Sequence, residues 1–163
     1  MNGLKDRIAV ITGGADGIGR ATAMRFAQEG AVVVIWDMNE EKGKQTAAEI
    51  NAAGGKASFL KVNTSNFAEV EAASKKVVEQ YGKYEILINN AGIQFTKRLD
   101  EQTDDEIAQE IAVNLTAPVQ LTRAFLPMLA GKPQAAVINV SSGLAVVPKE
   151  TCAVYCATKA ALH

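Results

Sequence analysis

Residues 7–19, RIAVITGGADGIG, indicate the fold class, because an apolar run leads directly into a glycine-rich loop. Gly13 permits a tight turn, Gly17 lets the backbone approach a ligand, and Gly19 allows a following helix to lie close to the strand. The N-terminus of that helix presents free N–H groups that suit a pyrophosphate. These residues therefore predict a strand, a phosphate-binding turn and a helix. Taken alone, the loop is also compatible with an ordinary strand-to-helix turn.

Four further runs of aliphatic or β-branched residues follow, at residues 31–36, 57–62, 85–90 and 135–140. Stretches with helical composition separate them, including residues 17–28 and 40–53. Most of the runs are nearly continuous in apolar residues, as expected for strands covered on both faces. With right-handed crossovers, this alternation predicts an α/β fold with a doubly wound parallel sheet, in a single domain over residues 1–163.

Two sequence patterns predict helix starts. Asn66 with Glu69, and Thr103 with Glu106, have the spacing of a capping box, in which each residue satisfies a backbone N–H of the other. Acidic residues 104–106 then belong to the first turn of a helix, where the helix dipole favours negative charge. We therefore interpret this acidic cluster as a helix start and predict no metal site.

Composition excludes several functions. The 163 residues include 17 basic and 18 acidic ones in scattered positions, so nucleic acid and membrane partners are not expected. There is no long apolar run and no leader pattern at the start, which favours a cytoplasmic protein. Cys152 and Cys156 match neither a redox nor a zinc spacing, and we expect reduced thiols. His163 is the single histidine, which excludes a Ser-His-Asp triad or a histidine metal site.

Asp37 follows the second apolar run, where an acidic side chain can accept hydrogen bonds from both adenosine ribose hydroxyls of a dinucleotide. A ribose 2′-phosphate would meet its negative charge, and neither Asp16 nor Met38 offers a cation to offset that charge. The sequence therefore favours NAD over NADP. The alternative is that Asp37 is a solvated turn residue.

Three motifs in order carry a resemblance to a known family. The pattern T-G-x-x-x-G-x-G at residues 12–19, NNAG at residues 89–92 and YCATK at residues 155–159 together resemble the short-chain dehydrogenase/reductase family. The resemblance covers the whole chain. It implies a Rossmann-like sheet with about five strands in the order 3-2-1-4-5.

The resemblance also implies a catalytic set. Tyr155 would be the acid/base, Lys159 would lower its pKa and bind the nicotinamide ribose, and Ser142 would hold the substrate oxygen. Asn114 would support a water and proton relay. Independently, a lysine one helical turn after a tyrosine, with a cationic nicotinamide nearby, favours the phenolate and brings proton transfer closer to neutral pH. Without the other motifs, Tyr155 and Lys159 would read as a helix-surface pair and Ser142 as a cap or turn residue.

The expected cofactor contacts gather at the glycine loop, the strand ends and the catalytic helix. Asn63 stands where the family has an acidic residue that touches the adenine, and its amide oxygen could accept from the adenine amino group. The NNAG motif should brace the fourth strand beside the adenosine half. The full predicted NAD(H)-binding set is Gly13, Asp16, Gly17, Ile18, Gly19, Asp37, Asn63, Asn90, Ala91, Gly92, Tyr155 and Lys159.

Family members continue beyond the Y-x-x-x-K helix into a sixth strand, a substrate-covering loop and a seventh strand, whereas this sequence ends at His163. We therefore expect a chain shortened just after that motif, without the last two strands. The fifth strand would then be a sheet edge open to pairing. That edge, and the family's use of its fourth and fifth crossover helices as a subunit interface, predict a homo-oligomer, either a dimer or a tetramer.

The expected function is an NAD-dependent oxidoreductase that interconverts a secondary alcohol and a carbonyl by hydride transfer. The alternative is an NAD(H)-binding module with little or no turnover, because the substrate-covering segment is absent. An inactive fragment is a third possibility, against which the intact glycine loop and Asp37 argue. The partner is then a small-molecule alcohol or carbonyl, in a site whose mouth includes Gln94, Leu144 and Val146.

Overall fold

Five parallel strands form one sheet in the computed structural model, which describes residues 3–163. Met1 and Asn2 lie outside the described residues. They belong to the predicted domain and to the N-terminal stretch in which the sequence shows no leader pattern. The strand order is β3-β2-β1-β4-β5, which confirms the expected topology. The strands are β1 (Ile8–Thr12), β2 (Val32–Asp37), β3 (Lys56–Lys61), β4 (Ile86–Asn89) and β5 (Ala136–Asn139).

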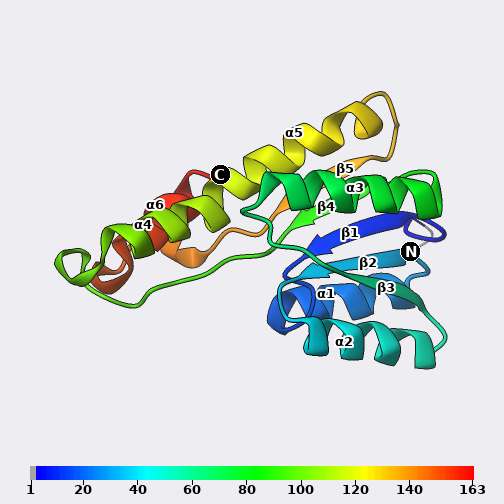
Figure 1. Ribbon diagram of the computed structural model, residues 1–163, viewed down its shortest axis with the longest axis horizontal. Helices are drawn as coiled ribbons and strands as arrows, with labels where there is room; N and C mark the ends of the chain where they lie inside the picture. Colours follow the sequence, from blue (N-terminus) through cyan, green and yellow to red (C-terminus); the bar gives the residue numbers. More distant parts are fainter. Residues whose placement is uncertain (1–2) are drawn as a thin grey trace.

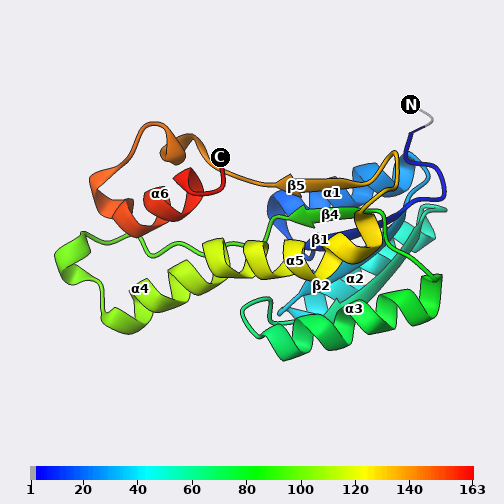
Figure 2. The same ribbon diagram turned by 90° about the horizontal axis from the view of Figure 1, so that it is seen from above.

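Helices cover both faces of this sheet (Figure 1). One face carries α1 (Gly17–Gln28) and α2 (Glu40–Ala52), and the other carries α3 (Phe67–Tyr81) and α5 (Ala117–Leu129). Beyond the carboxyl ends of the strands, α4 (Asp104–Ile111) and α6 (Ala153–Ala160) lie side by side, away from the sheet (Figure 2). A π-helical turn, η2 (Ala112–Thr116), joins α4 to α5. Among residues 3–163, no helix combines the length and the apolar composition that a membrane crossing requires.

Two hydrophobic cores form because successive side chains of a strand point to opposite faces. In β1, Val10 packs with α3 and α5, whereas Ile11 packs with α1 and α2. Val34 and Val33 of β2 divide in the same way. The nearly continuous apolar runs in the sequence are therefore the signature of a sheet buried on both faces.

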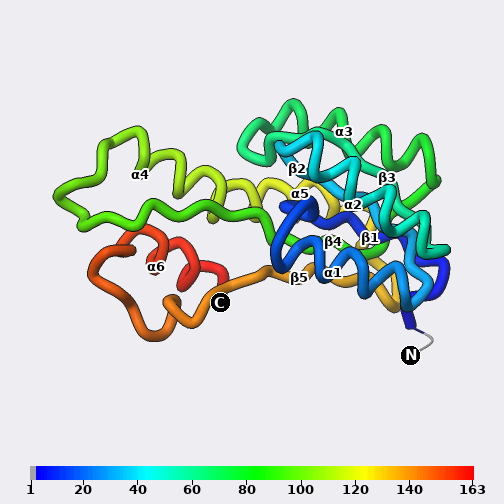
Figure 3. Tube along the Cα trace, turned by 90° about the horizontal axis from the view of Figure 1, so that it is seen from below, coloured from blue at the N-terminus to red at the C-terminus, as the bar shows by residue number. Residues whose placement is uncertain are grey.

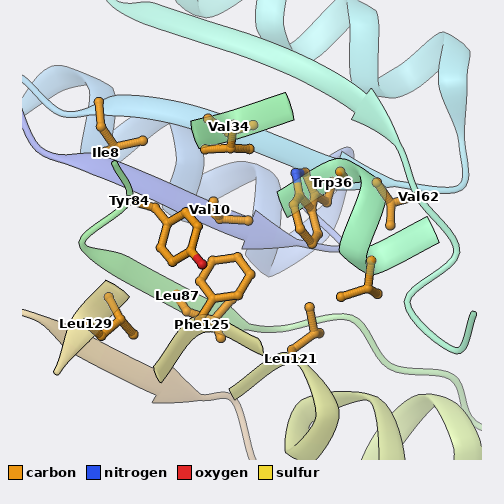
Figure 4. Packing of buried hydrophobic residues seen from close by; sticks show 13 residues of the cluster. Ile8, Val10, Val34, Trp36, Val62, Tyr84, Leu87, Leu121, Phe125 and Leu129 are labelled. Atoms are coloured by element: carbon orange, nitrogen blue, oxygen red, sulfur yellow. The ribbon is translucent and has the colours of Figure 1, made fainter. Parts of the chain in front are cut away.

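Three aromatic rings from distant parts of the chain meet in the core under α3 and α5 (Figure 4). The ring of Phe125 lies edge-on to Trp36, with centroids 5.7 Å apart and planes at 76°. Its centroid is 4.0 Å from that of Tyr84, with planes tilted by 31°. These contacts connect α5 to β2 and to the residues just before β4, so they fix the helix that follows the π-turn against the sheet.

The strand β5 is less buried than its apolar sequence predicts. Ile138 is 44% exposed, whereas its neighbour in register on β4, Ile88, is 3% exposed. The reason is position, since β4 has a strand on each side and β5 lies at the edge of the sheet. The expected edge is confirmed.

One of the two predicted capping boxes is confirmed. Thr103 Oγ1 accepts from the backbone N–H of Glu106 at 3.2 Å, and the Glu106 carboxylate accepts from the Thr103 N–H at 3.0 Å. The second prediction is half wrong. The Asn66 side chain caps α3, but the Glu69 carboxylate accepts from the backbone N–H of Asn63 at 2.8 Å. The Asn66 N–H already donates to the Asn63 carbonyl, at 3.0 Å, and needs no second partner.

Candidate functional site

A cleft of about 560 Å³ opens beside the glycine loop and the carboxyl ends of the strands. Parallel α/β sheets bind ligands at this edge, where the strand order reverses between β1 and β4. Eight residues of the predicted cofactor set line the cleft, namely Gly13, Asp16, Gly17, Asp37, Asn63, Asn90, Ala91 and Gly92. The structure therefore brings together most of the residues that the sequence singled out for the dinucleotide.

Three of the four loop glycines belong to the predicted cofactor set, and each is required for a different structural reason. Gly13 has a φ of +64°, and a Cβ there would lie 2.9 Å from the Cα of Ala91. A Cβ on Gly19 would lie 2.0 Å from the Gly13 carbonyl oxygen, so α1 can start this close to β1 only without a side chain there. Gly17 has a φ of +52° and no neighbouring atom within 4 Å of a built Cβ, which leaves its backbone open toward the cleft. Ile18 is 66% exposed.

Asn90 fastens the glycine loop to the end of β4. Its Nδ2 donates to the carbonyl oxygens of Thr12 at 3.0 Å and Gly13 at 3.1 Å. In return, Thr12 Oγ1 accepts from the backbone N–H groups of Asn90 at 3.0 Å and Ala91 at 3.1 Å. Four hydrogen bonds thus hold two segments that are distant in sequence in one fixed relation at the cleft.

Asp37 ends β2 and points its carboxylate at backbone donors. Oδ2 accepts from the Ala15 N–H at 3.0 Å, and Oδ1 accepts from the Asn39 N–H at 2.9 Å. These bonds hold the carboxylate between the glycine loop and the start of α2, on the wall of the cleft. The bond to Ala15 is a tertiary contact, whereas the bond to Asn39 is local to the turn that follows β2.

Lys42 is a cation near this carboxylate that the sequence reasoning missed. Its Nζ lies 2.5 Å from Asp16 Oδ2, and this hydrogen bond, together with the charges of Asp16 and Asp37, raises the pKa of Lys42. The same contact lowers the pKa of Asp16. Lys42 lies in the first turn of α2, where its backbone N–H donates to the side chain of the N-cap residue Asn39 at 3.0 Å. Asp16 and Met38 supply no cation, as expected, whereas Lys42 of the next helix does.

Asn63 lines the cleft with its amide oxygen already engaged. Oδ1 accepts from the Ser65 backbone N–H at 3.1 Å and from the Ser65 hydroxyl at 2.7 Å. An adenine amino group at this position would therefore share the oxygen with Ser65 or displace the hydroxyl.

The helix α6 carries Tyr155 and Lys159 to the other side of the site. Lys159 Nζ donates to the carbonyl oxygen of Val140 at 2.9 Å and lies 5.7 Å from the centroid of the Tyr155 ring. The same Nζ is 3.4 Å from the position of a Cβ built on Gly92, so a side chain there would crowd the ammonium group. Lys159 is only 4% exposed, and burial lowers its pKa.

The two serines after β5 do different things. Ser141 Oγ donates to the Lys159 carbonyl oxygen at 2.8 Å and so ties the end of the sheet to α6. Ser142 Oγ accepts from the Leu144 N–H at 3.2 Å and caps the short turn η3 (Gly143–Ala145). Within residues 3–163, Ser142 makes no hydrogen bond to Tyr155. Lys159, in contrast, is held in place by its hydrogen bond to the Val140 carbonyl oxygen.

Asn114 lies in the middle of the π-turn η2 and is fully buried. Its Oδ1 accepts from the Ile93 N–H at 2.8 Å, and its Nδ2 donates to the Ile93 carbonyl at 2.8 Å and to Thr158 Oγ1 at 3.3 Å. Asn114 thus joins the segment after β4 to the helix that carries Lys159. No sequence pattern predicts the π-turn, a rare conformation that often marks a functional site.

Two cysteines lie beside the site, and both are free and buried. Cys152 Sγ accepts from Gln94 Nε2 at 2.9 Å, which connects the segment after β4 to the start of α6. Cys156 faces the backbone of Lys149. Gln94, expected at the mouth of the site, is therefore held by a thiol three positions before Tyr155.

Comparison with known proteins identifies relatives over nearly the whole chain. A family model described as short chain dehydrogenase matches residues 7–163. A 2,5-dichloro-2,5-cyclohexadiene-1,4-diol dehydrogenase of Sphingobium indicum is 42% identical over 162 residues. That match covers 99% of this chain and 65% of the relative, so the chain spans about two thirds of the relative's length.

Solved structures share the fold. A metagenomic short-chain oxidoreductase in complex with NADP superposes with a TM-score of 0.93 at 35% identity, covering 98% of this chain and 73% of that one. A short-chain dehydrogenase/reductase from Burkholderia phymatum in complex with NAD gives a TM-score of 0.94 at 31% identity, covering 99% and 58%. Similar structures thus occur with either nucleotide.

Proposed function

The chain belongs to the short-chain dehydrogenase family, and on that premise we propose that the protein is an NAD-dependent oxidoreductase that interconverts a secondary alcohol and a carbonyl. When bound, NAD supplies the hydride acceptor or, in its reduced form, the hydride donor. Tyr155 takes up or releases the proton at its hydroxyl, and Ser142 holds the substrate oxygen. Lys159 holds the nicotinamide ribose, and Asn114 supports a proton relay through water.

The observation that carries this proposal is the buried ammonium group of Lys159. A buried cation usually has a carboxylate partner, because desolvation of the charge is costly. Within residues 3–163, the Nζ of Lys159 donates instead to the Val140 carbonyl, and burial is the cause of its lowered pKa. Ribose hydroxyls of a bound dinucleotide would supply the acceptors that the protein itself does not.

The rest of the cleft fits a dinucleotide. The open backbone at Gly17 and the N-terminus of α1 suit a pyrophosphate. Asp37 supports NAD over NADP, because its carboxylate lines the cleft and would repel a 2′-phosphate. The charge of Lys42 is engaged by Asp16. The remaining residues of the proposed cofactor set are Gly13, Ile18, Gly19, Asn63, Asn90, Ala91, Gly92 and Tyr155.

The alternative, an NAD(H)-binding module with little turnover, is favoured by one observation. Val146 and Val147, in the segment between β5 and α6, are 70% and 71% exposed. This segment joins Ser142 to the helix of Tyr155, and efficient hydride transfer needs water to be excluded from the reacting atoms. The two functions differ in whether bound nucleotide leads to turnover.

Initial rates with a panel of small alcohols and carbonyls test both functions. We expect NADH formation or consumption in the wild type and a rate lower by about 100-fold or more in Tyr155→Phe, because proton transfer loses its acid/base group. Tyr81→Phe is the matched control. It removes a hydroxyl that bonds Ser58 at 2.9 Å on the opposite side of the fold, and its rate should match that of the wild type.

Nucleotide binding completes the test. By fluorescence titration, NADH should bind at least about tenfold more tightly than NADPH, because the 2′-phosphate would lie against Asp37. Saturable NADH binding with equal rates in wild type and Tyr155→Phe would select the binding module. Equal affinity for the two nucleotides would contradict the NAD preference.

We also propose that the protein acts as a homo-oligomer in the cytoplasm on a small-molecule alcohol or carbonyl. The open edge of β5 and the exposed Val119 of α5, 60% exposed, support association. The free thiols of Cys152 and Cys156 support a reducing compartment.

A further inference from the structure

A fully buried carboxylate, that of Glu110, lies on α4 one helical turn before Asn114. Its Oε1 is 3.3 Å from the backbone N of Phe95, and its Oε2 is 3.3 Å from Nε2 of Gln102. Both are neutral donors. Glu110 therefore spans the segment 93–102, which runs from the end of β4 toward the start of α4 (Figure 3).

The charged neighbours of this segment are engaged elsewhere. Lys97 Nζ pairs with Glu106 at 2.5 Å. Arg98 pairs with Asp100 at 3.2 Å and also with Glu150. Burial of a carboxylate without a counter-ion is costly, and an apolar side chain of similar size would fill the same space at lower cost. Packing alone therefore does not account for a glutamate at this position.

The segment held by Glu110 borders the catalytic side of the site. Asn114 holds Ile93, which lines the cleft, through both backbone groups. Between the two anchored ends, Gln94 donates to Cys152 at the start of α6. The segment thus lies between α4 and α6, along the wall next to the helix of Tyr155 (Figures 2 and 3).

We propose that Glu110 is a positioning residue that fixes the segment 93–102 as the substrate-side wall. The effect on substrate rests on the proposed function, whereas the effect on the segment does not. A single carboxylate holds one backbone and one side-chain donor seven positions apart, so its loss frees the middle of the segment while Asn114 still holds the beginning.

Two substitutions separate positioning from general stability. Glu110→Gln keeps an acceptor for the Phe95 N–H. If the Gln102 amide turns over, the new amide can donate to Gln102 Oε1, which is buried without a partner in the wild type. Glu110→Leu keeps the volume and loses both bonds. Asp105→Leu removes an exposed carboxylate from the same helix and serves as the control.

Kinetics provide the first readout. In Glu110→Leu, we expect the KM for the carbonyl substrate to rise about tenfold, with the dissociation constant of NADH unchanged within about twofold. Glu110→Gln and Asp105→Leu should keep the wild-type KM. A loss of folded protein at constant KM, or the same KM rise in Glu110→Gln, would overturn the proposal.

Amide hydrogen exchange is the second readout and needs no turnover. Exchange at Phe95 should be about tenfold faster in Glu110→Leu and unchanged in Glu110→Gln. Equal exchange in all variants would overturn the proposal. If the wild type shows no turnover, the proposed function fails, and exchange alone then decides whether Glu110 holds the segment.

Discussion

A single missing Cβ, at Gly19, lets α1 approach the end of β1. In Gly19→Ala the new Cβ would meet the Gly13 carbonyl oxygen at 2.0 Å, and backbone cannot rotate away as a side chain can. We expect a loss of about 1–3 kcal/mol in the free energy of unfolding and weaker NADH binding. Urea unfolding and fluorescence titration measure the two effects. Gly3→Ala, where no atom lies within 4 Å of a Cβ, should leave both unchanged.

The buried ammonium group of Lys159 makes stability depend on pH. Burial lowers its pKa from 10.5, so between the folded pKa and 10.5 the unfolded chain binds more protons than the folded one. Stability should therefore rise with pH in this window, whereas the cost of the buried charge is fully present below the folded pKa. Urea unfolding from pH 7 to 10 should show wild type gaining stability relative to Lys159→Met. Parallel pH profiles would contradict this.

At the scale of elements, Asn114 fastens the π-turn to the segment after β4 through both backbone groups of Ile93. Asn114→Ala should cost about 2–4 kcal/mol in unfolding free energy, because both backbone groups of the half-buried Ile93 lose their bonds to a side chain that is itself fully buried. Asn51→Ala is the matched control. Asn51 binds both backbone groups of Ala57, at 2.8 and 3.0 Å, in an exposed position where water can replace it. Equal losses in both variants would argue against burial as the cause.

At the scale of the whole molecule, the exposed apolar positions predict association. Light scattering after size exclusion should give a mass of at least twice the 17.3 kDa of one chain. Val119→Glu on α5 should lower that mass if helices form the contact, whereas Ile138→Lys should lower it if the β5 edge does. A monomer in the wild type would contradict the prediction.

The sheet and the glycine loop can be predicted from the amino-acid sequence alone, because both are encoded locally. Apolar runs such as residues 31–36 are long enough to predict strands, and the spacing of Gly13, Gly17 and Gly19 predicts the turn. The Y-x-x-x-K spacing likewise placed Tyr155 and Lys159 on one helix, which α6 confirms.

The contacts between distant segments could not be predicted from the sequence and are seen only in the folded protein. No short motif relates the residues that meet in three of these contacts. They are the ion pair of Lys42 with Asp16 and the hydrogen bonds from the backbone N–H groups of Ile93 and Phe95 to the side chains of Asn114 and Glu110. Burial decided the environment of Lys159, whose lowered pKa depends on the sheet and helices around it. A sequence pattern records local backbone preference, whereas the partners and solvation of a side chain are set by what the whole fold packs around it.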